Sequence, residues 1–173
     1  MANFKEDLAR VKAFVFDIDG VLSLQTIALN AFGVPSRTVN LRDGYAIQLA
    51  VKKGYKVGII SGSKSKEYQK RLKRLGVTDV YLNSRLKINR FNDFLEKYHL
   101  PESEVLFMGD DIPDFEVMKK AGIPVCPSDA DSEIKELASY ISDKKGGEGC
   151  VRDVIEQVLR LHENWMDPDA FTW

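Results

Sequence analysis

The sequence predicts an α/β fold in which a mostly parallel sheet lies between two layers of helices. Short apolar runs of strand length alternate along the chain with segments of helical periodicity. Such alternation favours a parallel sheet covered on both faces. Several of the helical segments end at a glycine, a common way for helices to stop. The length of 173 residues suits one core, so we expect residues 1–173 to form a single domain.

Five compact apolar runs predict the strands, since they are short and rich in β-branched and aromatic residues. In chain order they are VKAFVF at 11–16, KVGII at 56–60, a short run at 80–82, VLFM at 105–108 and IPVC at 123–126. Six segments of helical pattern lie between and after them. They are 42–53, stopped by Gly54; the basic segment 64–75, stopped by Gly76; 88–98, followed by Pro101; 113–120, which opens with Pro113; 132–138; and 151–163, entered through a glycine-rich turn.

Two segments depart from this alternation. Residues 21–39 hold apolar and β-branched residues around a turn region at Asn30, Gly33 and Pro35, which predicts a β-hairpin after the first strand. Residues 165–173 carry three aromatic side chains, more than a solvated tail needs. We therefore expect this tail to dock on a protein surface.

Composition excludes several classes of protein. With 25 basic and 26 acidic side chains, the net charge of −1 gives no overall basic surface for nucleic acid. The apolar runs are too short to span a membrane, and residues 1–10 lack an apolar signal-peptide core. We therefore expect a cytoplasmic protein. Two cysteines, Cys126 and Cys150, are too few for a disulfide framework and are interpreted as structural thiols.

Polar residues follow three of the predicted strands, where ligands of parallel sheets bind. A lone D-x-D, serine or lysine is common in turns and on surfaces, so the ordered set carries the prediction. The set consists of Asp17, Asp19 and Gly20 after the first strand, Ser61, Gly62 and Ser63 after the second, Lys87 before a helix, and Asp110, Asp111 and Asp114 after the fourth.

This set is suited to phosphate chemistry with a divalent metal. Carboxylates from separate strands with a backbone oxygen make a hard oxygen site that suits Mg²⁺. A carboxylate such as Asp17 can attack phosphorus as a nucleophile. However, a phosphate dianion at about 4 Å repels it by about 8 kcal/mol at an effective dielectric of about 20. A nearby metal ion and Lys87 would reverse that local field.

Four stretches resemble the motifs of the haloacid dehalogenase-like phosphatase superfamily: FDIDGVL, IISGS, Lys87 and MGDDIPD. The resemblance implies a Rossmann-like, three-layer α/β/α fold and an aspartyl-phosphate intermediate. It also implies that Asp17 is the nucleophile, that Asp19 is the general acid/base, and that Ser61 and Lys87 bind the phosphoryl group.

The same resemblance implies a Mg²⁺ site held by Asp17, the Asp19 carbonyl and Asp110. Asp111 and Asp114 would contact these ligands or the metal's waters. The hairpin and helices use nearly all of the chain between the motifs, so we expect no inserted cap domain. A capless site is open to water, which does not suit a reactive acyl phosphate, and another subunit could close it.

Further features resemble the 3-deoxy-D-manno-octulosonate 8-phosphate phosphatase family: N-x-RDGY at 40–45, the hairpin, and GGxGxVR ending at Arg152. The resemblance implies hydrolysis of that phosphate monoester in lipopolysaccharide sugar biosynthesis. It also implies a homotetramer with packed hairpins, in which a tail such as 165–173 lies near the neighbour's site. The implied substrate contacts are Asp19, Asn40, Leu41, Arg42, Asp43, Gly44, Gln48, Ser63, Arg71 and Lys87.

Several positions depart from that family's pattern. Ser63 and Gln48 stand where basic residues are usual, Leu24-Gln25 replaces an acidic-glycine pair, and Pro113 replaces an asparagine. The lost positive charge leaves a related nine-carbon keto-sugar acid 9-phosphate open as the substrate. Two other classes remain as alternatives: a phospho-accepting receiver domain and a non-catalytic binding homologue. Receivers lack D-x-D-G after the first strand, and the complete motif set disfavours a non-catalytic protein.

Overall fold

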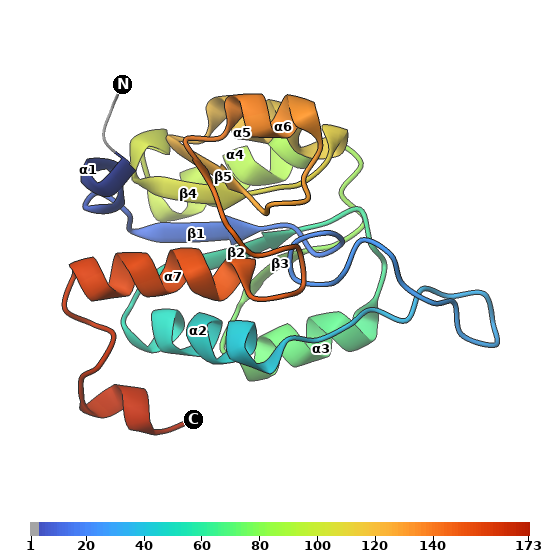
Figure 1. Cartoon of the computed structure of the whole chain (residues 1–173), viewed down its shortest axis with the longest axis horizontal. Coiled ribbons are helices and arrows are strands. Elements are labelled where there is room, and N and C mark those ends of the chain that lie inside the picture. Colours follow the sequence, from blue (N-terminus) through green and yellow to red (C-terminus); the bar gives the residue numbers. More distant parts are fainter. Residues whose placement is uncertain (1–3) are drawn as a thin grey trace.

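The computed structural model describes residues 4–173 and has a six-stranded parallel sheet between two helical layers (Figure 1). The strand order is β3-β2-β1-β4-β5-β6. The predicted three-layer α/β fold is therefore confirmed. The strands are β1 (Ala13–Phe16), β2 (Lys56–Ile60), β3 (Asp79–Tyr81), β4 (Val105–Met108), β5 (Ile123–Cys126) and β6 (Tyr140–Ile141). The helices are α1 (Phe4–Leu8), α2 (Leu41–Lys52), α3 (Lys66–Arg74), α4 (Lys87–Tyr98), α5 (Phe115–Lys120), α6 (Ser132–Leu137) and α7 (Cys150–Leu161).

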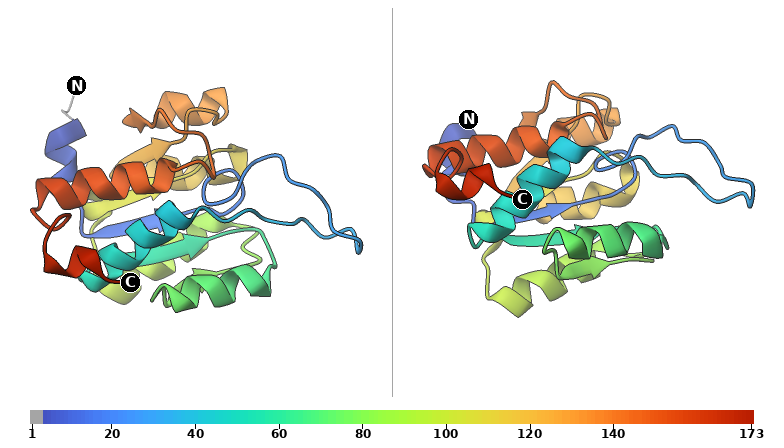
Figure 2. Two further views of the ribbon diagram at one scale, coloured as in Figure 1. Left: turned by 60° about the horizontal axis from the view of Figure 1, so that its bottom comes forward. Right: turned by 90° about the horizontal axis from the view of Figure 1, so that it is seen from below.

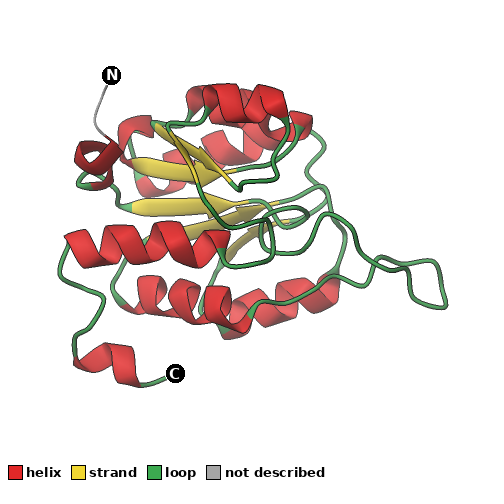
Figure 3. Ribbon diagram, viewed as in Figure 1, coloured by secondary structure: helices red, strands yellow, loops and turns green. Residues whose placement is uncertain are grey.

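The two faces of the sheet bury separate cores, because successive side chains of a strand point to opposite sides. In β1, Phe14 and Phe16 pack in the cluster formed with α2, α3 and α7. Ala13 and Val15 belong to the other cluster, formed with α4, α5 and α6. Figure 3 shows the helices on both sides of the strands. Within residues 4–173, no helix is both long and apolar enough to span a bilayer.

The element bounds differ from the prediction mainly where capping decides. The predicted 64–75 helix begins at Lys66, because the Ser65 side chain accepts a hydrogen bond from the Tyr68 amide. The segment 113–120 is divided into a 3₁₀ turn at Ile112–Asp114 and α5. The two-residue β6 and the five-residue α1 were not predicted, since neither is long enough to show a period. The 3₁₀ turns at Glu102–Glu104 and Pro168–Phe171 were also not predicted.

Residues 21–39 have the course of a hairpin but no regular strands. A single antiparallel bridge joins Leu29 and Pro35, and the Asn30 side chain accepts hydrogen bonds from two amides of the turn. The predicted β-hairpin is thus corrected to a two-armed loop that projects from the body of the domain (Figure 2). An isolated two-stranded ribbon is marginal without packing partners. Here the side chain of Phe32, at the tip, is 90% exposed.

The aromatic tail docks on α2 of its own chain. Trp165 is buried, and both Trp165 and Trp173 contact the ring of Tyr45 edge-on. The Lys53 ammonium pairs with Asp167 and Asp169. Apolar contact and charge pairing together hold the tail against the helix.

Asp43 joins α2 to α7. Its Oδ1 atom accepts a hydrogen bond from the Arg152 amide at 2.7 Å, so it caps the start of α7. Its Oδ2 atom is buried and accepts no hydrogen bond from the part of the chain that the structure describes. Burial raises the pKa of Asp43 from 3.8 to about 6, more than the Arg152 amide and charge lower it.

The pKa of Asp43 predicts a pH dependence of stability. Between about pH 4 and pH 6 the folded protein binds this proton more readily than the unfolded chain, so stability is lost as pH rises through that window. A shift of about two pKa units is worth up to about 3 kcal/mol. Asp43→Asn cannot titrate there. The free energy of unfolding in urea, measured for both proteins from pH 4 to pH 7, should therefore fall more steeply for the unmodified chain. If the free energies of unfolding of the two proteins differ by the same amount at every pH, the raised pKa of Asp43 is contradicted.

Candidate active site

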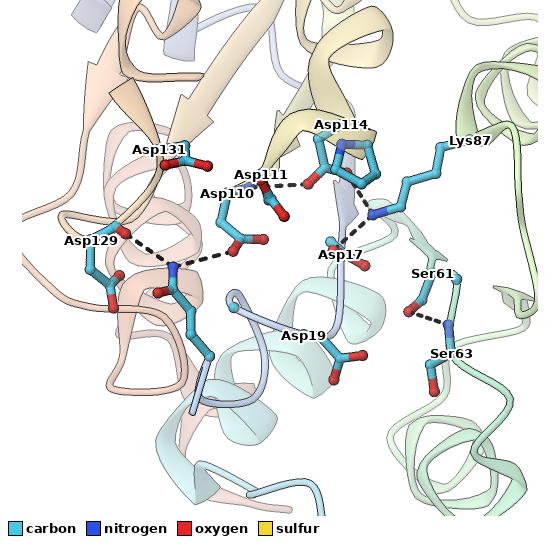
Figure 4. A pocket seen from close by; sticks show the side chains of 14 residues that line it. Asp17, Asp19, Ser61, Ser63, Lys87, Asp110, Asp111, Asp114, Asp129 and Asp131 are labelled. Atoms are coloured by element: carbon cyan, nitrogen blue, oxygen red, sulfur yellow. Dashed lines mark hydrogen bonds and ion pairs between the residues drawn. The ribbon is translucent and has the colours of Figure 1, made fainter. Parts of the chain in front are cut away.

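The carboxyl ends of β1, β2 and β4 meet at one edge of the sheet around a cavity of about 440 Å³ (Figure 4). Each polar residue enters it directly from the loop after a strand or from a helix start. Of the predicted residues, the cavity is lined by Asp17, Asp19, Ser61, Ser63, Lys87, Asp110, Asp111 and Asp114. The residues that were selected because they follow predicted strands therefore lie around one cavity.

The turn after β1 requires a glycine. Gly20 has a φ of +85°, which side chains other than glycine's rarely allow. A Cβ atom at Gly20 would lie 1.9 Å from Oδ2 of Asp110. The backbone of this turn therefore packs directly against the carboxylate that follows β4.

Lys87 bridges two carboxylates from different strands. Its Nζ atom is 2.8 Å from Oδ2 of Asp17 and 2.7 Å from Oδ1 of Asp114, and all three side chains are buried. Burial by itself would lower the pKa of Lys87, but the charges of Asp17 and Asp114 raise it well above its usual value. Lys87 therefore remains an ammonium and supplies positive charge inside the cavity.

Asp110 has an oxygen atom that nothing in the described chain satisfies. Its Oδ1 atom is buried with no hydrogen-bond partner. Burial, together with the charges of Asp114 and Asp17, raises the pKa of Asp110 to about 8. Burial and the charge of Asp114 also raise the pKa of Asp17. This concentration of negative charge is the arrangement that a bound cation relieves.

The donor set fits a hard divalent metal. Asp17, Asp110 and Asp114 each offer a carboxylate oxygen, and these atoms lie within 4.8 Å of one another. Both Asp114 oxygens already have partners, Lys87 and the Asp110 amide. The Asp17 oxygens also have partners, the Ile18 amide and Lys87, so among these three only Asp110 keeps an oxygen atom without a partner in the described chain. All three carboxylates are oxygen donors of the kind that suits Mg²⁺ and similar cations.

Ser61 and Ser63 form one wall of the cavity. Both are buried, and the Ser63 amide donates to the Ser61 hydroxyl at 3.1 Å. The Ser63 hydroxyl in turn accepts from the Ser65 amide at the start of α3. The chain after β2 is thus pinned in a tight turn, and both serines line the same cavity as Asp17 and Lys87 (Figure 4).

Asp19 has a partner that sequence reasoning missed. Arg37, on the returning arm of the 21–39 loop, holds both Asp19 carboxylate oxygens at 2.7 and 2.8 Å. A single arginine in a loop carries no pattern that could have revealed this contact. Asp129 and Asp131 also line the cavity and were missed. They follow β5, so extending the strand-end rule to that strand would have found them.

The remaining predicted substrate contacts lie outside the cavity in the single chain. Asn40 caps α2 and Asp43 caps α7, while Arg71 lines a separate hollow beneath the 21–39 loop. Arg42 lies in another hollow beside Arg152. Their contact with substrate stays a prediction. The full set outside the cavity is Asn40, Leu41, Arg42, Asp43, Gly44, Gln48 and Arg71.

Comparison with known proteins places this geometry in a family. The haloacid dehalogenase-like hydrolase family model matches residues 76–155. The chain is 36% identical over 149 residues to the Escherichia coli K12 3-deoxy-D-manno-octulosonate 8-phosphate phosphatase KdsC, covering 86% of this chain and 79% of that protein.

Solved structures agree. The phosphatase of the same name from Yersinia pestis superposes with a TM-score of 0.89 at 29% identity, covering 93% of this chain and 87% of that one. The Moraxella catarrhalis phosphatase, in complex with magnesium ion, phosphate ion and KDO, superposes with a TM-score of 0.90 at 28% identity, covering 99% and 97%. Fold, cavity and sequence agree: within the haloacid dehalogenase-like hydrolases, this chain belongs to the 3-deoxy-D-manno-octulosonate 8-phosphate phosphatase family, whose members are phosphoric monoester hydrolases.

Proposed function

We propose that this chain is a Mg²⁺-dependent phosphatase that hydrolyses the phosphate monoester of 3-deoxy-D-manno-octulosonate 8-phosphate, in lipopolysaccharide sugar biosynthesis. The observation that carries the proposal is the Asp17–Lys87–Asp114 bridge beside the unpartnered Asp110 oxygen. The names of its relatives supply the substrate, and the Moraxella catarrhalis complex supports the metal and the sugar acid.

Asp17 and Asp110 would hold Mg²⁺, with the Asp19 backbone carbonyl as a third ligand. When bound, the cation neutralises charge on the phosphate and on the carboxylates that approach it. Lys87 and Ser61 would bind phosphoryl oxygens, as an ammonium and a hydroxyl donor. Because Lys87 is held by two carboxylates, its position is set before substrate arrives.

Asp17 then attacks phosphorus with one carboxylate oxygen, and the bond from phosphorus to the sugar oxygen breaks. Asp19 gives its proton to the departing sugar alkoxide. In the second half, water attacks the phosphorus of the aspartyl phosphate. Asp19 takes the proton of that water, inorganic phosphate leaves, and Asp17 is restored. Arg37 occupies both Asp19 oxygens in the free protein, so this ion pair must open for Asp19 to give or take a proton.

A nine-carbon keto-sugar acid 9-phosphate is the alternative substrate. Three of the positions that depart from the family's pattern, Gln25, Ser63 and Pro113, line the cavity, so they bear on which sugar fits. A receiver domain or a non-catalytic homologue would not release phosphate from substrate over repeated turnovers.

Phosphate release from a panel of phosphorylated keto-sugar acids, with and without Mg²⁺, tests the proposed function. We expect many turnovers with the eight-carbon 8-phosphate and a loss of at least about a thousandfold in kcat for Asp17→Asn. Asp93→Asn, a matched change at an exposed ion pair with Arg90, should keep full activity. A preference for the nine-carbon 9-phosphate would favour the alternative. A single turnover, or unimpaired release by Asp17→Asn, would overturn the mechanism.

Metal binding should depend on pH because the ligands must lose protons first. The raised pKa of Asp110, about 8, predicts that Mg²⁺ affinity rises from pH 6 to pH 9, by at most about tenfold per pH unit for each proton displaced. Calorimetry at pH 7 in two buffers of different ionisation enthalpy measures the released protons. Asp110→Asn should lose most of the affinity. Affinity that is constant across this range, with no proton release, would show that Asp110 is already ionised without metal.

We also propose that the protein assembles as a homotetramer in which a neighbouring subunit completes the site. The projecting 21–39 loop supports this, since Leu29, Phe32 and Val34 are all exposed along it. The tail is held on α2, yet Trp173 and Phe171 remain exposed for a neighbour to contact. A cytoplasmic location stays a prediction of the sequence.

Light scattering should give a mass of about four times the 19.6 kDa chain. Phe32→Ser should shift the mass toward smaller species, because it removes the most exposed apolar side chain of the loop. Lys5→Ser, far from the loop, is the control and should not change the mass. A monomer mass for the unmodified protein would contradict the shared site.

A further inference from the structure

Gln25 forms a bridge across the rim of the cavity. Its side-chain amide nitrogen donates to Oδ2 of Asp110 at 3.3 Å and to the backbone oxygen of Asp129 at 3.0 Å. The dashed lines that end at Asp110 and Asp129 in Figure 4 mark these two bonds. A glutamine amide has two N–H groups, so both are used. Gln25 therefore links the loop after β1 to the loops after β4 and β5.

This bridge distinguishes the two oxygens of Asp110. Oδ2 accepts the Gln25 amide and lies against Gly20, where a Cβ atom would be only 1.9 Å away. Oδ1 is buried and has no hydrogen-bond partner among residues 4–173. Oδ2, which is crowded by Gly20, thus has a hydrogen-bond donor, whereas Oδ1 remains available for a ligand.

Other contacts hold the acceptors of the Gln25 amide in place. The Asp129 carboxylate accepts from the Gly146 amide at 2.9 Å, and the Gly147 amide donates to the Val21 oxygen at 2.8 Å. The loop that carries Asp129 and the glycine-rich stretch therefore pack on the same turn from which Gln25 reaches out. Gln25 spans two anchored segments, which orients its amide toward Asp110.

We propose that Gln25 is a positioning residue for Asp110, which reserves Oδ1 for the cation and makes the carboxylate a one-oxygen ligand. The inference rests on the metal site of the proposed function. Mg²⁺ needs a near-octahedral shell with one oxygen from each carboxylate, whereas Ca²⁺ accepts both oxygens of a carboxylate and a more variable geometry. Gln25 therefore favours Mg²⁺ over Ca²⁺. Partners that orient a ligand in this way commonly change metal affinity 10- to 100-fold.

The test is calorimetric titration of the full chain with MgCl₂ and separately with CaCl₂. Gln25→Met keeps the length of the side chain but removes the amide. It should weaken Mg²⁺ binding about tenfold and leave Ca²⁺ binding unchanged or tighter, so that the preference for Mg²⁺ falls about tenfold. Gln25→Ser, too short to reach Asp110, should behave alike. Gln69→Met, a matched change on α3 outside the cavity, should bind both ions as the unmodified chain does.

Three results for Gln25→Met would overturn the inference: a Mg²⁺ dissociation constant within twofold of the unmodified value, tighter Mg²⁺ binding, or equal weakening of Mg²⁺ and Ca²⁺ binding. Thermal unfolding of each variant without metal separates a loss of ligand positioning from a loss of fold. No Mg²⁺ binding by the unmodified chain would also overturn it. The proposed phosphatase activity fails separately, if the unmodified chain binds Mg²⁺ but releases no phosphate from any sugar acid.

Discussion

The buried ion pairs of Lys87 are the interaction on which the rest of the site depends. Asp17 follows β1 directly and Asp114 lies in the 3₁₀ turn after β4, and without a cation between them two buried carboxylates would repel each other. Removing one partner of a buried ion pair typically costs about 3–5 kcal/mol, because a charge is left uncompensated. Lys87 is the first residue of α4, so the start of one helix is fixed by carboxylates at the ends of β1 and β4. The ammonium group that we propose to bind phosphate is thereby set in position by the fold itself.

Close packing of loops explains motif residues that carry no chemistry. A Cβ atom at Gly146 would lie 1.9 Å from the Gly20 oxygen, so the glycine-rich stretch before α7 presses on the turn that follows β1. Asp43 accepts a hydrogen bond from the Arg152 amide in the first turn of α7, which follows that stretch directly. Parts of the sequence that resemble a substrate-binding signature thus also serve to join α2, α7 and the turn after β1. Arg37 adds a link from the projecting loop to Asp19, so a change in that loop would reach the carboxylate proposed as the acid/base.

The strand-end rule succeeded because parallel strands bring their carboxyl ends to one edge, whatever lies between them in the chain. It selected Asp17, Ser61 and Asp110 correctly as neighbours. It could not find Arg37, because contact between a loop and the sheet edge leaves no period in the sequence. The rule also could not distinguish the roles of Asp114 and Asp110. Only the hydrogen bonds of the folded chain show that both Asp114 oxygens have partners while Oδ1 of Asp110 has none among the described residues.

By itself, the sequence determined the alternation of strands and helices, the identity of the family and the chemical types gathered at the cavity. These depend on local periodicity and on short ordered motifs, which a linear chain displays directly. Only the tertiary structure decided that residues 21–39 form a loop without regular strands, that the tail packs on α2, and that Gln25 reaches Asp110. Each of these outcomes depends on which distant surface a segment meets, and that is settled by packing in three dimensions.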